Sequence, residues 1–128
     1  MAFQRNINTQ DRINQLLALH NKARAKDNAK LPLLKINNKL VEYAQYWADE
    51  MAKGNLLVHS NMQDILKLGF QAVGENVAWN QDSTYFVTDS WLRSPGHREN
   101  IMKPFTQVGF GVACNHKNQP YWCAVFAD

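Results

Sequence analysis

The sequence predicts an α+β fold in which helices pack over a small antiparallel sheet. Helical spacing of apolar residues dominates the N-terminal part of the chain, and the clearest strand-like alternation comes at its C-terminal end. This segregation is typical of α+β domains. A chain of 128 residues, 45% hydrophobic and without internal repeats or linkers, can bury its own core, so we expect one domain over residues 1–128, with residues 1–8 as an N-terminal arm.

The first helix is expected to begin at Asn8 or Thr9, either of which can cap it, and to run to about Lys26. Residues suited to the core recur every three or four positions along it: Ile13, Leu16, Leu17 and His20. Because this spacing places them on one side of a helix, we expect that side to be buried.

A second helix is expected after the loop that contains Pro32, with Asn37 or Asn38 as its cap. Its apolar positions again lie three or four residues apart: Leu40, Ala44, Trp47, Ala48 and Met51. Gly54 is expected to supply the left-handed residue that stops the helix.

The middle of the chain predicts a short helix in "NMQDILKLGF", ended by Gly69, and then a strand in "AVGENVAW". A third long helix is expected to start at Asp82 or Ser83. It should end near Arg93, because Pro95 disfavours helix in the residue before it. "GHRENIM" can add one helical turn before "VGFGVAC" and "YWCAVFAD", which alternate as an antiparallel pair of strands.

The two cysteines, Cys114 and Cys123, flank the polar turn of this pair in "CNHKNQPYWC". A disulfide between them is plausible, and in the chain-entropy model it would stabilise the fold by roughly 2.5–3 kcal/mol. It would also place the protein outside the cytosol. Two buried thiols are the alternative, and two cysteines alone are too few ligands for a zinc site.

Charge and hydropathy exclude two classes of partner. The net charge is +3, from 14 basic and 11 acidic residues, and the densest basic run, Lys22 to Lys30, fits the solvated end of a helix better than a nucleic-acid-binding face. We therefore expect no nucleic-acid partner. No apolar run approaches the ~20 residues of a transmembrane helix, and "MAFQRNINTQ" lacks the apolar stretch of a signal peptide, so a secreted protein would have its targeting segment outside this sequence.

Three separated residues form the candidate site: His59 in "LVHSN", Glu75 in "GEN" and His97 in "SPGHREN". All three occupy loops or the head of a strand, and such segments converge at one end of a compact sheet. Neutral imidazoles bind zinc or copper, and a carboxylate completes the shell or orients a histidine. The same set could transfer protons near neutral pH.

A structural interpretation of these residues stays open, because their spacing is not a metal-binding signature. In it, Glu75 accepts hydrogen bonds from backbone N–H groups, and each histidine ties two loops together. His20 and His116 are assigned no functional role. Trp79 either closes a groove beside the histidines or covers the sheet edge.

The stretches "LVHS", "GENVAW", "SWLRSPGHRENIM", "VGFGVAC" and "YWCAVFA" occur in this order. Together they resemble the CAP superfamily, or SCP domain, which comprises cysteine-rich secretory proteins, antigen 5 and pathogenesis-related group one proteins. The resemblance runs from about Thr9 to the end of the chain, and "SPGHREN" is similar to compact, cysteine-poor bacterial members. It implies a three-layer α-β-α sandwich, with a central antiparallel sheet and helices on both faces.

The resemblance also implies a cleft lined by two histidines and acidic residues, and the matching positions are His59, Glu75 and His97. Relatives of this kind can bind zinc or other divalent ions through both histidines, which makes His59 and His97 the expected ligands of a weakly bound Zn²⁺ or another divalent metal. Members with the full set have a second glutamate three residues after the tryptophan of the third helix, where this chain has Ser94. Any mechanism that needs two carboxylates is weakened by this difference.

Members of the family look like secreted modules that bind lipids, sterols or protein partners, and protease activity has been proposed for some. We therefore expect a monomeric secreted, periplasmic or extracellular protein that acts mainly by binding a protein, lipid or sterol. The alternative is a metal-assisted hydrolase, in which His59 and His97 hold the metal and Glu75 is the base. Lipid or sterol binding would require an open groove between helices.

Overall fold

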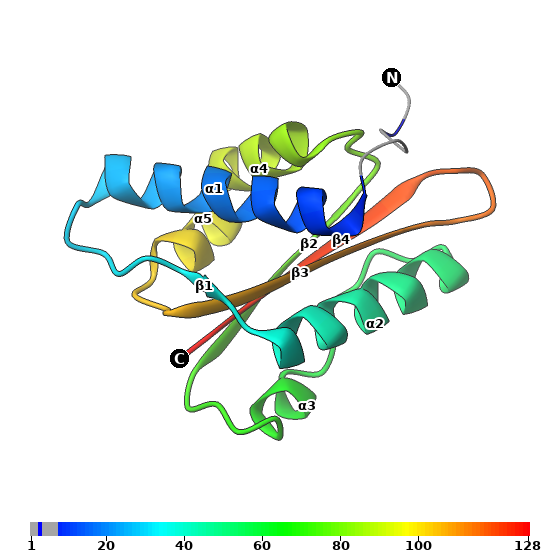
Figure 1. Ribbon diagram of the computed structural model, residues 1–128. Coiled ribbons are helices and arrows are strands. Elements are labelled where there is room, and N and C mark those ends of the chain that lie inside the picture. The colour runs from blue at the N-terminus through cyan, green and yellow to red at the C-terminus, as the bar shows by residue number, and fades with distance from the viewer. Residues whose placement is uncertain (1–2, 4–7) are drawn as a thin grey trace.

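The computed structural model describes residue 3 and residues 8–128. It is a three-layer sandwich in which α2 and α3 cover one face of a sheet and α1, α4 and α5 cover the other (Figure 1). The predicted fold class is therefore confirmed. The predicted N-terminal arm, residues 1–8, falls mostly outside the described residues.

The first two helices begin where their caps predict. Helix α1 spans Thr9–Asp27 and α2 spans Asn38–Gly54, and the side chains of Asn8 and Asn37 accept hydrogen bonds from N–H groups of the first turns. The residue that ends α2 differs from the prediction. Gly54 is helical, and Asn55 adopts the left-handed conformation, with φ of 51°. Asparagine tolerates this region better than most residues, so it replaces glycine as the stop.

The other helices are α3 (Met62–Leu66), α4 (Thr84–Arg93) and α5 (Pro95–Met102). Gly69 follows α3 with φ of 108°, as expected of the residue that turns the chain. The eight residues of α5 exceed the single turn predicted, because Pro95 suits the first position of a helix. None of the helices in the described part of the chain has the length and apolar composition of a membrane-spanning segment.

The sheet has the strand order β1-β3-β4-β2. Strands β2 (Val73–Trp79), β3 (Gln107–Cys114) and β4 (Pro120–Ala127) pair antiparallel, as predicted. Strand β1 (Lys35–Ile36) was not predicted and pairs parallel to the start of β3, so the sheet is mixed. The short β1 leaves the rest of β3 as one sheet edge, and β2 forms the other.

Helix α2 lies against β3 with its backbone in direct contact with two glycines. A Cβ atom on Gly109 would lie 2.2 Å from the Leu40 carbonyl carbon, and one on Gly111 would lie 2.5 Å from the Gln45 nitrogen. Real Cβ atoms do not approach backbone so closely, so the "VGFGVAC" glycines fix the distance between helix and sheet.

The opposite face of the sheet is filled by large rings. Buried Trp91, Phe110 and Phe126 surround the imidazole of His20, which is fully buried and hydrogen-bonded through Nδ1 to the Leu16 carbonyl oxygen at 2.7 Å. Burial lowers the pKa of His20 from 6.5 to about 4. The histidine is therefore a neutral core residue at physiological pH.

Arg24 connects the C-terminal part of α1 to the loop at Pro32 and to the segment from Ile101 to Phe105. Its guanidinium donates to four carbonyl oxygens: Nη1 to Ile101 (2.8 Å) and Lys103 (2.7 Å), and Nη2 to Pro32 (2.6 Å) and Phe105 (2.9 Å). These bonds fix the C-terminal end of α5 against α1.

Side chains close both edges of the sheet. On β3, the Gln45 amide donates to the Val112 carbonyl at 2.9 Å and accepts from the Val112 N–H at 3.3 Å, as a neighbouring strand would. On β2, the Trp91 indole N–H donates to the Val77 carbonyl at 3.2 Å. Each edge therefore has fewer open backbone groups for another strand to pair with.

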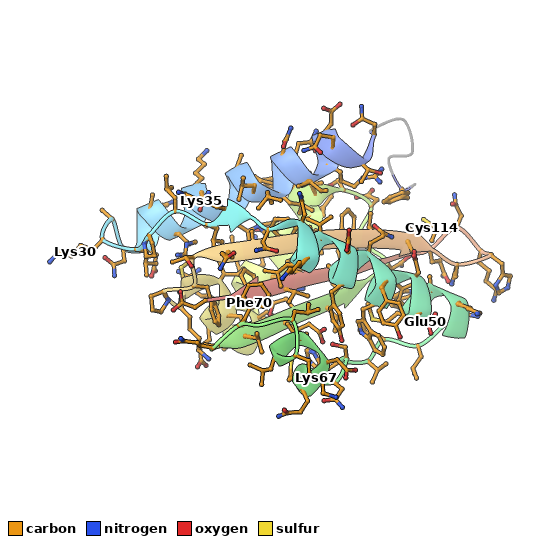
Figure 2. All side chains as sticks on the ribbon, turned by 60° about the horizontal axis from the view of Figure 1, so that its bottom comes forward. Lys30, Lys35, Glu50, Lys67, Phe70 and Cys114 are labelled. Atoms are coloured by element: carbon orange, nitrogen blue, oxygen red, sulfur yellow. The ribbon has the colours of Figure 1, made fainter. Side chains whose placement is uncertain are left out.

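The predicted disulfide is wrong, because Cys114 and Cys123 are both thiols. Cys123 pairs with Gly111 in the hairpin and belongs to the cluster under α2. Cys114 lies at the end of β3, beside the hairpin turn (Figure 2). It comes two residues after Val112, which packs on the α1 face of the sheet. Because side chains alternate along a strand, the two thiols point to opposite faces of the sheet.

Candidate functional site

The site is built around Glu75, near the start of edge strand β2. Its side chain is only 1% exposed, whereas that of His59 is 59% exposed. Oε1 of Glu75 accepts from the Ser60 N–H and lies 2.9 Å from His59 Nδ1, and Oε2 accepts from the Ser60 hydroxyl at 2.5 Å. The buried carboxylate therefore fixes both the imidazole of His59 and the loop that carries it.

Two more side chains bound Glu75 on the α2 face of the sheet. The Cys123 thiol donates to Oε2 at a sulfur–oxygen distance of 3.9 Å. Burial, reinforced by the carboxylate, raises the pKa of Cys123 well above its ordinary value, so the group is a protonated thiol rather than a nucleophile. Burial also raises the pKa of the Tyr43 phenol, with a smaller contribution from Glu75. On this side, Glu75 therefore faces two protonated, uncharged groups, the Cys123 thiol and the Tyr43 phenol.

His97 comes from the first turn of α5, and its Nδ1 lies 2.9 Å from the hydroxyl oxygen of Ser94. Its carbonyl oxygen accepts from the Asn76 side chain at 3.0 Å, which joins α5 to β2. Burial first, and the nearby charge of His59 second, lower the pKa of His97. The structure therefore brings His59 and Glu75 into contact, and His97 lies near enough for the charge of His59 to affect its pKa.

Sequence reasoning missed the residues that hold this arrangement. Asn100 donates to the Glu75 carbonyl at 3.1 Å and to the Asn76 side-chain oxygen at 2.9 Å, and so completes the connection between α5 and β2. The asparagines lie within "GENVAW" and "SPGHREN", which were singled out for other residues. Ser60 directly follows His59, but a single serine carries no chemical signature.

The chemistry open to this group follows from the hydrogen bonds of the imidazoles. Both Nδ1 atoms are engaged, by Glu75 and Ser94, so Nε2 is the nitrogen of each ring that remains to bind a ligand. Among the described residues, no group of three or more His, Cys, Asp or Glu side chains is arranged to hold a metal. The described residues therefore do not provide the three protein ligands of a hydrolytic zinc centre.

Known proteins share this fold and this sequence pattern. The sequence model of the cysteine-rich secretory protein family, CAP, matches residues 17–126. An outer surface protein of Borrelia burgdorferi superposes with a TM-score of 0.84 at 23% identity, covering 95% of this chain and 96% of that one. An extracellular protein of Bacillus anthracis that contains an SCP domain gives 0.76 at 25% identity, covering 97% of this chain and 45% of that one.

A sequence relative is the uncharacterized protein YkwD of Bacillus subtilis, 31% identical over 87 residues. The match covers 61% of this chain and 34% of the relative. The chain therefore spans about a third of the length of its curated relatives.

Proposed function

The chain belongs to the cysteine-rich secretory protein family, CAP, and from this premise we propose that it is an extracytosolic binding protein whose His59–Glu75–His97 group takes a divalent metal weakly. One observation carries the proposal. His59 and His97 each have Nδ1 occupied by a neighbouring oxygen, and the charge of His59 contributes to the lowered pKa of His97. Metal-binding histidines ordinarily use one nitrogen for the metal and the other for such a partner. Zn²⁺ would be held by the two Nε2 atoms, and it would supply a Lewis acid with open coordination positions.

The location outside the cytosol rests on the family and on the neighbours named above. The family model is that of secretory proteins, the Bacillus anthracis protein is extracellular, and the Borrelia protein lies on the outer surface. Buried, protonated Cys123 is compatible with either redox compartment, so the absent disulfide does not weigh against this location.

The environment of Glu75 favours binding over hydrolysis. A general base must reach the proton that it abstracts, directly or through one water molecule. Glu75 is almost fully buried, and both of its oxygens already accept hydrogen bonds from His59 or Ser60. In the hydrolase alternative, Glu75 would have to break one of these hydrogen bonds in order to accept a proton from the water that attacks the substrate. It is better suited to orienting His59.

Zinc titration by calorimetry near neutral pH tests the proposal. The wild type should bind Zn²⁺ weakly, and His59→Ala combined with His97→Ala should abolish the binding heat with little change in thermal stability. His116→Ala, which removes an exposed histidine from the β3–β4 turn, is the matched control and should bind like the wild type. Equal affinity in the double variant, or no binding by the wild type, would refute the metal site.

A second candidate function, lipid binding, is supported by a hollow between α1 and α4. The hollow measures about 280 Å³. Its lining combines apolar side chains with two lysines from α1: Leu19, Lys22, Ala23, Lys26, Tyr85, Thr88, Asp89 and Leu92. Apolar walls with adjacent ammonium groups suit an amphiphile with an anionic head, such as a fatty acid.

This second candidate is tested with a fluorescent fatty acid. Ala23→Trp should fill the hollow and lower the bound fraction, whereas Ala18→Trp, on the exposed side of the same helix, should leave it unchanged. Identical uptake by the two variants would exclude the hollow as the lipid site. Sterols can be tested in the same assay.

A further inference from the structure

The two histidines of the candidate site differ in the oxygen that each Nδ1 meets. His59 faces the Glu75 carboxylate, whereas His97 faces the hydroxyl of Ser94, each at 2.9 Å. An ionised carboxylate can only accept a hydrogen bond, but a hydroxyl can donate or accept. A neutral imidazole has one N–H and one lone pair, so the role of Nδ1 decides which of the two Nε2 presents. The two rings therefore need not offer the same group to a ligand.

Glu75 leaves His59 a single neutral tautomer. The oxygen that meets His59, Oε1, also accepts from the Ser60 backbone N–H at 2.9 Å, and an amide can only donate. The other oxygen, Oε2, accepts from the Ser60 hydroxyl and the Cys123 thiol. Because Oε1 is an acceptor, Nδ1 of His59 must be the donor. The neutral ring of His59 therefore presents the lone pair of Nε2.

Ser94 imposes no such choice on His97. Ser94 is the N-cap of α5, but its side chain makes no capping hydrogen bond. Its other hydrogen bonds use the backbone, since its N–H donates to the Trp91 carbonyl at 3.2 Å and its carbonyl accepts from the Arg98 N–H at 2.8 Å. In the described part of the chain, the hydroxyl bonds only to Nδ1 of His97. Its proton can therefore point toward that nitrogen or away from it.

No protein group at the far side of either ring fixes the tautomer. Among the described residues, Nε2 of His59 and Nε2 of His97 have no hydrogen-bond partner. Neither atom is sealed in the core, where the unpaired buried atoms belong to His20, Arg24 and Gln81. A ligand at Nε2 of His97 can therefore select the tautomer that it needs: a metal ion needs the lone pair, and an oxygen acceptor needs the N–H.

We propose that Ser94 is a positioning residue, whose hydroxyl lets His97 exchange between its two neutral tautomers. His59 is held in one of them by Glu75. The consequence for zinc rests on the function proposed above. Zn²⁺ needs a lone pair on both Nε2 atoms, so it must select the form of His97 in which Nδ1 donates to Ser94. A site whose binding-competent form is only partly populated binds with reduced affinity, and Ser94 therefore weakens metal binding.

The test is imidazole ¹⁵N NMR of the metal-free, ¹⁵N-labelled chain at about pH 8.5, where histidine is ordinarily neutral. Protonated and lone-pair nitrogens have well-separated ¹⁵N shifts. His59 should show only the Nδ1–H form, and His97 should show the Nε2–H form or shifts averaged between the two. Ser94→Asp offers only an acceptor, so it should convert His97 to the Nδ1–H form and tighten zinc binding about tenfold in calorimetry.

Two variants serve as controls. Ser94→Asn has the size of the aspartate, but its uncharged amide can donate or accept, so His97 should behave as in the wild type. Ser90→Asp adds the same charge one helical turn earlier and leaves the partner of Nδ1 in place. It should leave the shifts of His97 unchanged and raise zinc affinity less than Ser94→Asp does.

The outcomes separate this inference from the metal site. A wild-type His97 found only in the Nδ1–H form, or shifts of His97 that Ser94→Asp does not change, would overturn the role of Ser94 even if zinc binds. Equal zinc affinity in Ser94→Asp and Ser90→Asp would also overturn it, because charge alone would then explain the gain. The expected shifts without zinc binding by any variant would support the role of Ser94 and refute the metal site.

Discussion

The two faces of the sheet are packed by opposite means. On the α2 face, Gly109 and Gly111 remove side chains so that helix backbone meets strand backbone. On the α1 face, Trp91 and Phe110 fill the space with rings around a neutral His20. The α2 face is therefore destabilised by added side-chain volume, whereas the α1 face is destabilised by lost volume or added charge.

The largest effect is expected from Gly109→Ala. The new methyl group would lie 2.2 Å from the Leu40 backbone, which has no flexible side chain to move away, so α2 must shift as a unit. We expect a loss of at least about 4 kcal/mol in the free energy of unfolding, measured by urea denaturation.

Gly54→Ala is the matched control, because a Cβ atom on Gly54 meets nothing within 4 Å and the residue is helical. It should leave stability unchanged or raise it by up to about 1 kcal/mol. Comparable destabilisation by the two alanines would contradict the direct backbone contact between α2 and β3.

The next effect concerns charge on the opposite face. Because burial lowers the pKa of His20 from 6.5 to about 4, acid protonates this group in the unfolded chain before it does so in the fold. Stability should therefore be complete above pH 6.5, fall as the pH drops from 6.5 to about 4, and lose about 3 kcal/mol from this group. Urea denaturation at several pH values measures the loss.

His20→Leu removes the titrating group and serves as the comparison variant. Its stability should be lower at pH 7, because the bond to the Leu16 carbonyl is lost, but it should depend less on pH below 6.5. An equally steep acid loss in both proteins would show that other groups govern acid unfolding.

The smallest effects are expected at the two sheet edges. Gln45→Leu deletes both hydrogen bonds to Val112, and Trp91→Phe deletes only the indole N–H that reaches Val77. We expect the free energy of unfolding to fall by about 1–2 kcal/mol for the first change and by about 1 kcal/mol for the second. The second change loses some further stability because phenylalanine has a smaller ring than tryptophan. Hydrogen exchange should speed up at the Val112 amide in Gln45→Leu only. Unchanged protection of the Val112 amide would mean that the Gln45 side chain does not protect this edge of β3 in the way that a neighbouring strand would.

Local patterns in the sequence were sufficient for most secondary structure. Helix spacing and caps located α1 and α2, and alternation located β3 and β4. The disulfide failed for a reason of register. Cys114 pairs with Pro120, so Cys123 lies three positions further along and on the other face. Sequence reveals the presence of the turn more readily than the pairing that the turn imposes.

The candidate site was predictable only as a set of residue types. His59, Glu75 and His97 carry recognisable chemistry, and the structure places His59 in contact with Glu75, with the charge of His59 acting on His97. Ser60 and Asn100 could not be found, because small polar residues in loops acquire a role only through tertiary neighbours.

Arg24 has a consequence for the order in which the chain can assemble. Three of its four carbonyl partners lie 77 to 81 residues later in the sequence, in Ile101, Lys103 and Phe105. An N-terminal fragment would therefore hold a guanidinium that lacks three of its four acceptors, and α1 would have no α5 to dock against. Such long-range closure favours late, cooperative folding, in which α1 and α5 become protected in the same step rather than in chain order.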